Sequence, residues 1–173
     1  MENRHWDRLL YHALAQHTVV RELPVEWRMR WDPDQQGIVQ SWFSNPGNDE
    51  DWLPVRVDSA YNNQPAGKAW SAAHGNTSFV GKVWYRIRFE MDPQWQGKVL
   101  SFLIGAVDEA ATVYLNGVKI GEHPFAKPND WQTPFTIPLG NAARFGEPNE
   151  LIVEVENNIG AGGIWKPVWI VNG

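Results

Sequence analysis

The chain has 173 residues, of which 43% are hydrophobic and 20% charged, and its formal net charge at pH 7 is −5. This composition is typical of one globular domain with a buried core, and it excludes an intrinsically disordered chain. No basic run is present, so we expect no nucleic-acid partner. Cysteine is absent, which excludes disulfides, thiolate metal sites and a cysteine nucleophile.

The sequence carries no recognisable membrane or export signal. It has no long apolar run, so we expect no transmembrane segment and no membrane partner. Residues 1–17 lack the apolar core of a secretory signal peptide. Cysteine-free chains occur on both sides of a membrane, and the localisation is therefore left unknown.

The first predicted element is a short helix from Asn3 to about His17. We assign it to an N-terminal extension, residues 1–22, ahead of a domain that spans residues 23–173. A helix packed on that domain is the first interpretation, with a linker helix or a dimer contact as the alternatives. The evidence is a set of apolar residues at helical spacing, namely Trp6, Leu9, Leu10, Ala13 and Leu14.

Strand-like runs and loops fill the first half of the domain. The run 25–31 alternates in polarity, as a half-buried strand does. Two further extended runs are predicted at Ile38–Phe43 and Trp52–Val57. Ser59–Ser78 is a long loop that carries Trp70 and His74, and loops of this length in compact domains are usually functional or mobile.

The second half of the domain has the clearest strand pattern. Val83–Met91 alternates between an apolar face and a polar face that carries Arg86 and Arg88. Asn116-Gly117 predicts a hairpin, because both central residues of a type I′ turn need positive φ. The other predicted strands are Lys98–Ile104, Ala111–Leu115, Val118–Ile120, Thr133–Leu139, Glu150–Glu156 and Ile164–Val171.

These elements together predict an all-β fold. Strands joined by turns, with no helical pattern after the first 20 residues, indicate an antiparallel two-sheet β-sandwich with a short N-terminal helix.

Five segments also occur in the order found in one known family. They are WYRIRF (84–89), GAVDEAATVYLNGVKIGEH (105–123), WQTPFTIPL (131–139), NELIVEVEN (149–157) and GGIWKPVWI (162–170). In this order they resemble the sugar-binding domain of glycoside hydrolase family 2, the β-galactosidase and β-glucuronidase group. The resemblance covers residues 25–172 and implies a jelly-roll sandwich of the galactose-binding-domain-like kind.

The resemblance also bears on catalysis. In the family the catalytic glutamates lie on a separate barrel domain, which would need about 250 more residues. Asp108 and Glu109 make a poor acid–base pair, because neighbouring residues of an extended strand point to opposite faces. We therefore assign no catalytic residue to this chain.

Sugar binding needs exposed aromatic rings and a few planar polar groups in a concave site. Each aromatic candidate has the alternative of being a core residue. The polar face with Arg86 and Arg88 is either a solvated sheet surface or the floor of a groove. The candidate carbohydrate-binding residues are the aromatics nearest to long loops and the polar residues of the domain's loops: Trp70, His74, Asp108, Trp131, Asn157, Asn158, Trp165 and Lys166.

A structural calcium ion is the one cofactor that the sequence suggests. Asp32 and Asp34 alternate as oxygen ligands do in a calcium loop, but the distal bidentate glutamate is missing. No other cofactor is expected.

Two functions remain open. The leading hypothesis is a non-catalytic module that binds a mono- or oligosaccharide. The alternative is a structural module that braces a glycosidase catalytic domain or a homo-oligomer and binds no free sugar. Exposure of Trp70, Trp131 and Trp165 around one cleft favours binding, whereas their burial beside an exposed apolar patch near the N-terminal helix favours docking.

Overall fold

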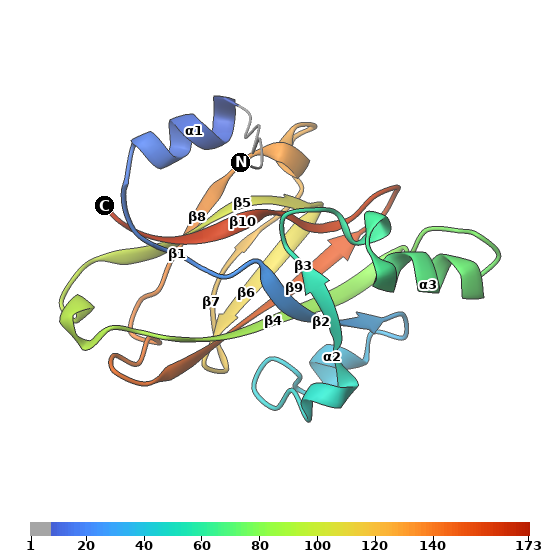
Figure 1. Cartoon of the computed structure of the whole chain (residues 1–173), viewed down its shortest axis with the longest axis horizontal. Coiled ribbons are helices and arrows are strands. Elements are labelled where there is room, and N and C mark those ends of the chain that lie inside the picture. Colours follow the sequence, from blue (N-terminus) through green and yellow to red (C-terminus); the bar gives the residue numbers. More distant parts are fainter. Residues whose placement is uncertain (1–7) are drawn as a thin grey trace.

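The protein is a sandwich of two antiparallel β-sheets, as seen in a computed structural model that describes residues 8–173 (Figure 1). The four-stranded sheet has the order β1-β10-β5-β8, and the six-stranded sheet has the order β3-β2-β4-β9-β6-β7. The two-sheet architecture predicted from the sequence is thereby confirmed. The strands are β1 Thr18–Glu22, β2 Glu26–Asp32, β3 Leu53–Arg56, β4 Gly81–Glu90, β5 Leu100–Asp108, β6 Ala110–Leu115, β7 Val118–His123, β8 Phe135–Pro138, β9 Pro148–Asn157 and β10 Gly163–Asn172.

Short helices lie outside the sheets and in the connections. α1 packs on the outer face of the four-stranded sheet, where Leu10 is buried against Leu103 and Trp169. Residues 3–7 of the predicted N-terminal helix lie outside the described residues. The helices are α1 Arg8–Ala15, α2 Gln36–Val39 and α3 Pro65–Ala73, and the 3₁₀ turns are η1 Asp49–Asp51, η2 Tyr61–Asn63, η3 Pro93–Trp95 and η4 Asp130–Gln132.

Residues 18–22 form a strand of the sandwich. Thr18 pairs with Asn172 and Glu22 pairs with Trp169, so β1 lies at the edge of the four-stranded sheet beside β10. The predicted N-terminal extension, residues 1–22, thus contributes a strand to the sheet of the domain that follows it. The division of the chain at residue 22 stays a prediction.

The core between the sheets follows the alternation predicted from the sequence. On β4, Tyr85 and Ile87 face this core, and Tyr85 pairs with Val153 of β9. Asn116 and Gly117 have φ values of 51° and 81°, which confirms the predicted positive-φ turn of the β6–β7 hairpin.

The prediction of a strand at Ile38–Phe43 is wrong. α2 occupies Gln36–Val39, and Val39 is 75% exposed. The carboxylate of Asp32 explains the helical turn. It accepts hydrogen bonds from the backbone N–H groups of Gln36 and Gly37, at 2.6 and 2.9 Å, and so satisfies donors of the first turn.

The prediction that Ser59–Ser78 is a loop is also wrong, because this segment contains η2 and α3. α3 begins at Pro65, where the fixed φ of proline suits a first helical turn. The helix is alanine-rich, and Gly67 fits close to the backbone carbonyl of Tyr61. α3 lies beyond the ends of the strands, on the right of Figure 1.

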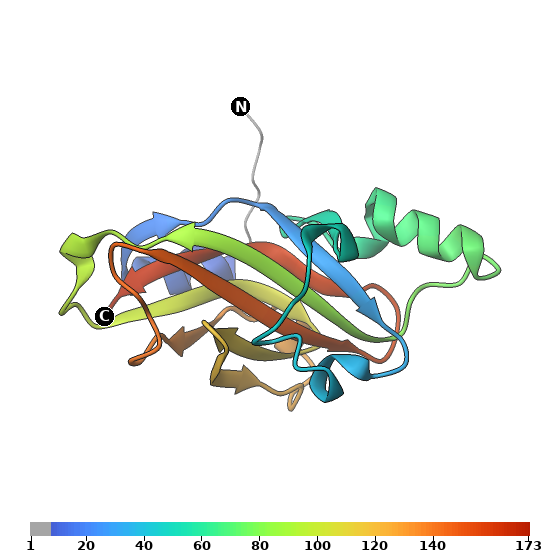
Figure 2. The same ribbon diagram turned by 90° about the horizontal axis from the view of Figure 1, so that it is seen from below.

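The segment after β2 folds back over the outer face of the six-stranded sheet (Figure 2). Each of its buried indole N–H groups has a protein acceptor: Trp42 donates to Gln40 Oε1 at 3.0 Å and Trp52 to the Pro46 carbonyl at 2.8 Å. The strand prediction treated β4 as half-buried, but β4 is buried on both faces from residue 83 to residue 87. The residues buried together on this face, which we call the closed cluster, are Trp42, Trp52, Trp84, Tyr114 and Ile152.

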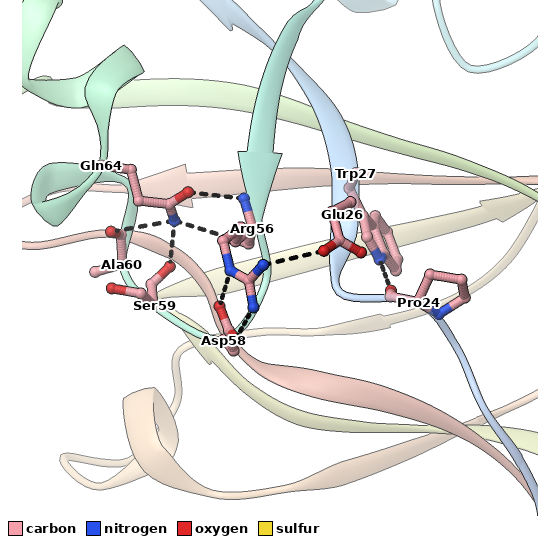
Figure 3. A network of polar contacts seen from close by, with 8 residues as sticks. All are labelled: Pro24, Glu26, Trp27, Arg56, Asp58, Ser59, Ala60 and Gln64. Atoms are coloured by element: carbon pink, nitrogen blue, oxygen red, sulfur yellow. Dashed lines mark hydrogen bonds and ion pairs between the residues drawn. The ribbon is translucent and has the colours of Figure 1, made fainter. Parts of the chain in front are cut away.

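β3 is an edge strand of the six-stranded sheet, and the side chain of Gln64 closes that edge (Figure 3). Gln64 Oε1 accepts from the Arg56 backbone N–H at 2.7 Å, and Nε2 donates to the Arg56 carbonyl at 2.8 Å. This amide occupies both backbone groups of Arg56, as a neighbouring strand would. The edge is therefore closed to another chain at that residue.

Candidate functional site

Six of the eight predicted binding residues lie at one end of the sandwich, which we call the β9–β10 end. It is made by the corner between β5 and β6 at residues 108–110, the loop 158–162 between β9 and β10, and η4. Gly163 pairs with Asp108, and the Glu109 backbone N–H donates to the Glu156 carbonyl at 3.1 Å. The corner and the loop are therefore held side by side.

The Glu109 carboxylate anchors the loop 158–162, and Asp108 is the neighbouring carboxyl at the same corner of the chain. Glu109 is buried, and its Oε1 accepts from the backbone N–H groups of Asn158 at 2.9 Å and Ile159 at 3.1 Å. Burial, and secondly the charge of Glu109, raise the pKa of Asp108 to about 6. Of the two, the sequence predicted only Asp108 as a binding candidate, and the anchoring role of Glu109 was not predicted.

Trp131 and Trp165 form an aromatic pair at the same end, which we call the open pair. Their ring centroids are 5.7 Å apart at an interplanar angle of 22°, and the Trp165 indole N–H donates to the Trp131 carbonyl at 2.8 Å. Trp131 is 39% exposed. Lys166 is buried, and its Nζ lies 4.5 Å from the centroid of the Trp165 ring. An exposed indole is thus held in place without being covered.

The loop that carries Trp131 is fixed by Asp130. Its Oδ2 accepts from the backbone N–H groups of Ala126 at 2.8 Å and Lys127 at 2.7 Å. These hydrogen bonds, the Lys127 bond first, lower the pKa of Asp130. The turn that carries Trp131 is therefore held in place by hydrogen bonds to Asp130.

The Asn157 side chain is buried and hydrogen-bonded within the domain, whereas Asn158 is exposed. The Asn157 amide donates to the Tyr61 hydroxyl at 2.8 Å and to the Gly160 carbonyl at 3.0 Å. Burial raises the pKa of Tyr61 to about 12. A Cβ on Gly162 would lie 2.5 Å from the Asn157 amide nitrogen, so the glycines make room for this contact. We expected both asparagines to face a cleft, but only Asn158 lies at the surface.

Trp70 and His74 form a separate group on and after α3. Their rings stack at 3.7 Å and 9°, and His74 Nδ1 lies 2.8 Å from the Trp70 carbonyl oxygen. The Trp70 ring also contacts Trp31 at 5.3 Å and Phe79 at 4.9 Å. Its faces are therefore largely occupied within the protein.

The candidate calcium ligands do not meet. Asp32 is buried, and both of its oxygens accept hydrogen bonds: Oδ1 from the Gln36 backbone and Oδ2 from Gly37 and the Trp84 indole at 2.9 Å. Asp34 is exposed. Within residues 8–173 no group of three or more His, Asp or Glu side chains is placed to hold a metal ion.

The structure also contains a groove that the sequence only partly indicated. Its volume is about 350 Å³, and it lies on the outer face of the six-stranded sheet. We call it the arginine groove, since Arg28 joins the two arginines that we considered as a groove floor. The lining residues are Glu26, Trp27, Arg28, Asp49, Pro54, Arg86, Ile87 and Arg88.

Comparison with curated proteins gives relatives among glycosidases. The β-glucuronidase of Paenibacillus borealis is 27% identical over 138 residues, which are 80% of this chain and 21% of the relative. The β-galactosidase BoGH2A of Bacteroides ovatus is 28% identical over 127 residues, 69% of this chain and 14% of the relative. The chain thus spans about a fifth or less of the length of the curated relatives it matches. No family model matches it.

Solved structures share the fold. The β-glucuronidase of Ruminococcus gnavus in complex with D-glucuronic acid superposes with a TM-score of 0.74 at 18% identity, over 88% of this chain and 29% of that chain. The unliganded enzyme gives a TM-score of 0.75 over 91% of this chain. The sequence relatives and this fold confirm the resemblance to the sugar-binding domain of glycoside hydrolase family 2. Within residues 8–173 no helix has the length and apolar character needed to cross a membrane.

Proposed function

We propose that this chain is a non-catalytic carbohydrate-binding domain of a glycosidase, with its sugar held at the β9–β10 end. The observation that carries the proposal is the open pair: the Trp131 indole is 39% exposed and stacked on the Trp165 indole, whose N–H donates to the Trp131 backbone carbonyl at 2.8 Å. Exposed, immobilised aromatic rings bury a large area at low conformational-entropy cost. The apolar face of a pyranose ring fits such a surface.

Polar groups near the open pair would fix the hydroxyls. Gly163 pairs with Asp108, which places this carboxyl near the start of the strand that carries Trp165. With a pKa of about 6, Asp108 is partly protonated just below neutral pH and can donate as well as accept a hydrogen bond. The exposed Asn158 offers both donors and an acceptor from the neighbouring loop.

The assignment as non-catalytic rests on the carboxylates. Glycoside hydrolysis uses two carboxyl groups across the scissile bond. At this end Glu109 and Asp130 each already accept two backbone N–H groups, whereas no such contact is found for Asp108 within residues 8–173. The curated relatives are several times longer than this chain, and the matched region is 21% of one and 14% of another. Their names make β-linked glucuronic acid and galactose the first sugars to test.

A second function is favoured by a separate observation. Trp70 and Asn157 are engaged within the domain, by His74 and Tyr61 respectively, and are not available to a sugar without rearrangement. This favours a domain that braces a glycosidase catalytic domain or a homo-oligomer. In that case the open pair is a docking surface for protein.

A fluorescence titration separates the two functions. The 173-residue chain is titrated with glucuronic acid, galactose and their β-linked oligosaccharides, and the same is done with Trp131→Ala. We expect a saturable shift for one sugar class that Trp131→Ala abolishes and that Tyr11→Ala, an exposed aromatic on α1, retains. Trp131→Phe should keep part of the response, because its phenyl ring still offers a face on which a sugar can stack. A flat response from folded protein across the panel favours the bracing function.

A further inference from the structure

The arginine groove contains a like-charge arrangement that sheet stability alone would disfavour. Arg28 of β2 pairs directly with Arg86 of β4, and Arg88 lies two residues farther along the same face of β4. Like charges directly opposite each other destabilise an antiparallel pair. Breaks of a local rule in an otherwise consistent fold concentrate at functional sites, and the groove is therefore a candidate site.

Two carboxylates compensate part of this charge. Arg86 Nε donates to Glu150 Oε2 at 2.9 Å and Nη1 to Asp49 Oδ1 at 3.1 Å, while Arg88 Nε donates to the same Glu150 oxygen at 2.8 Å. The Arg86 side chain is only 3% exposed, yet its Nη2 has no hydrogen-bond partner among residues 8–173. A buried guanidinium nitrogen of a groove-lining residue is thus left unsatisfied, which is costly unless a water or a small rearrangement supplies an acceptor.

Arg28 has no carboxylate partner within the described residues. Glu26, which also lines the groove, is turned toward Arg56: its Oε1 accepts from Arg56 Nη1 at 3.0 Å, and Arg56 is also held by both oxygens of Asp58 (Figure 3). The one hydrogen bond found for the Arg28 side chain is a long contact of 3.4 Å with the Trp52 carbonyl. Three guanidinium groups therefore lie near three carboxylates, Glu26, Asp49 and Glu150, but Glu26 pairs with Arg56 and the other two pair with Arg86 and Arg88. Arg28 is thus the groove arginine for which no ion pair is found among residues 8–173.

We propose that the arginine groove binds the carboxylate of a small ligand such as a sugar acid, at a site separate from the open pair. A guanidinium presents planar N–H donors that match a carboxylate. A monoanion would supply the ion-pair partner that Arg28 lacks, whereas a phosphate dianion would bring a second negative charge close to Asp49. A volume of about 350 Å³ is enough for a small molecule.

The floor of the groove is preorganised, and its rim is exposed. Arg86 is held at the floor by its two carboxylate contacts, with its guanidinium carbon 5.8 Å from the Trp52 ring of the closed cluster. Arg88 is 63% exposed and Arg28 is also exposed, so both stand at the rim. A carboxylate that enters between them therefore meets one guanidinium that is already held, that of Arg86, and has to order the two exposed arginines of the rim.

Calorimetric titration with D-glucuronate and D-glucose tests the proposal, since the two sugars differ only in the carboxylate at C6. We expect saturable binding of glucuronate that weakens as salt is raised, and no binding of glucose at the groove. Arg28→Gln should weaken glucuronate binding about tenfold, the loss expected for one charged hydrogen bond. Arg8→Gln, the same change on α1 on the other sheet's outer face, should leave it unchanged.

Three results would overturn the proposal: no glucuronate binding, equal glucuronate binding by Arg28→Gln and the unchanged protein, or tighter binding of inorganic phosphate than of glucuronate. Arg88→Gln provides a second rim variant that leaves the buried Arg86 in place. Circular dichroism confirms that each variant is folded. Trp131→Ala separates the two sites, because it should remove sugar stacking at the open pair and retain the carboxylate-dependent binding in the groove.

Discussion

The closed cluster and the open pair both contain tryptophan rings, but they differ in how far those rings are exposed to solvent. In the closed cluster Trp52 and Trp84 are about 1% exposed or less, and their indole N–H groups are bound within the protein. In the open pair the Trp165 indole N–H is also satisfied, but Trp131 keeps 39% of its surface exposed. Tryptophan content alone therefore says little about sugar binding, and the covering segment decides which rings can meet a ligand.

The largest expected effect is in the closed cluster. Trp84→Ala removes a ring buried between the sheet and the segment that follows β2, and it leaves a cavity and deprives Asp32 Oδ2 of one of its two donors. We expect the free energy of unfolding to fall by about 3–5 kcal/mol. Denaturant unfolding measures this loss. A loss below about 1 kcal/mol would mean that the cluster is not a closed unit.

Asp32→Ala should have the next largest effect. It leaves the Trp84 indole and the backbone N–H groups of Gln36 and Gly37 without their acceptor. We expect a loss of about 2–4 kcal/mol in the free energy of unfolding. Asp34→Ala, two residues away and exposed, is the matched control and should stay within about 0.5 kcal/mol. Similar losses for both variants would contradict the capping role of Asp32.

A smaller, pH-dependent effect is expected at the β9–β10 end. The pKa of Asp108 is raised from 3.8 to about 6 in the folded protein. Between these pH values the folded state binds more protons than the unfolded state, so the free energy of unfolding falls as pH rises. In Asp108→Asn this decrease in the free energy of unfolding with rising pH should be absent. After allowance for solvent screening of this half-buried group, the variant should be about 1 kcal/mol more stable at pH 7.5 and unchanged near pH 4. Parallel stability curves for the two proteins would contradict the shift.

The smallest stability effect is expected in the open pair. Trp131→Ala removes an exposed ring, and we expect a loss of less than about 1 kcal/mol in the free energy of unfolding. The same variant should lose its fluorescence response to sugar. Thermal unfolding followed in parallel with Trp84→Ala makes the comparison direct. A loss as large as that of Trp84→Ala would place Trp131 in the core.

Local patterns predicted most of the sandwich, because strand alternation and turn chemistry are encoded in neighbouring residues. Asn116-Gly117 and the alternation of β4 are examples. The outer face of β4 was missed, since the burial of Trp84 depends on a segment that folds back from residues 36–52. α3 was missed although Pro65 and the alanines after it are a usable helix signal.

The candidate site was predicted in part for the same reason. Closeness to long loops singled out Trp131 and Trp165, and the family-like segment 105–123 singled out Asp108; the structure places all three at one end. The burial of Asn157 depends on Tyr61, which is far away in the sequence, and no local pattern reveals such a contact. The arginine groove could not be predicted from local patterns, because it depends on the pairing of β2 with β4, which places Arg28 opposite Arg86.

An NMR titration of the indole N–H signals with glucuronic acid, galactose and their β-linked oligosaccharides tests the central claim most directly. The signals of the open pair are assigned with Trp131→Phe and Trp165→Phe, and those of Trp52 and Trp84 serve as internal references. We expect the open-pair signals to shift saturably with one sugar class while the closed-cluster signals stay in place. No shift for any sugar, or shifts confined to the closed cluster, would contradict carbohydrate binding at the β9–β10 end.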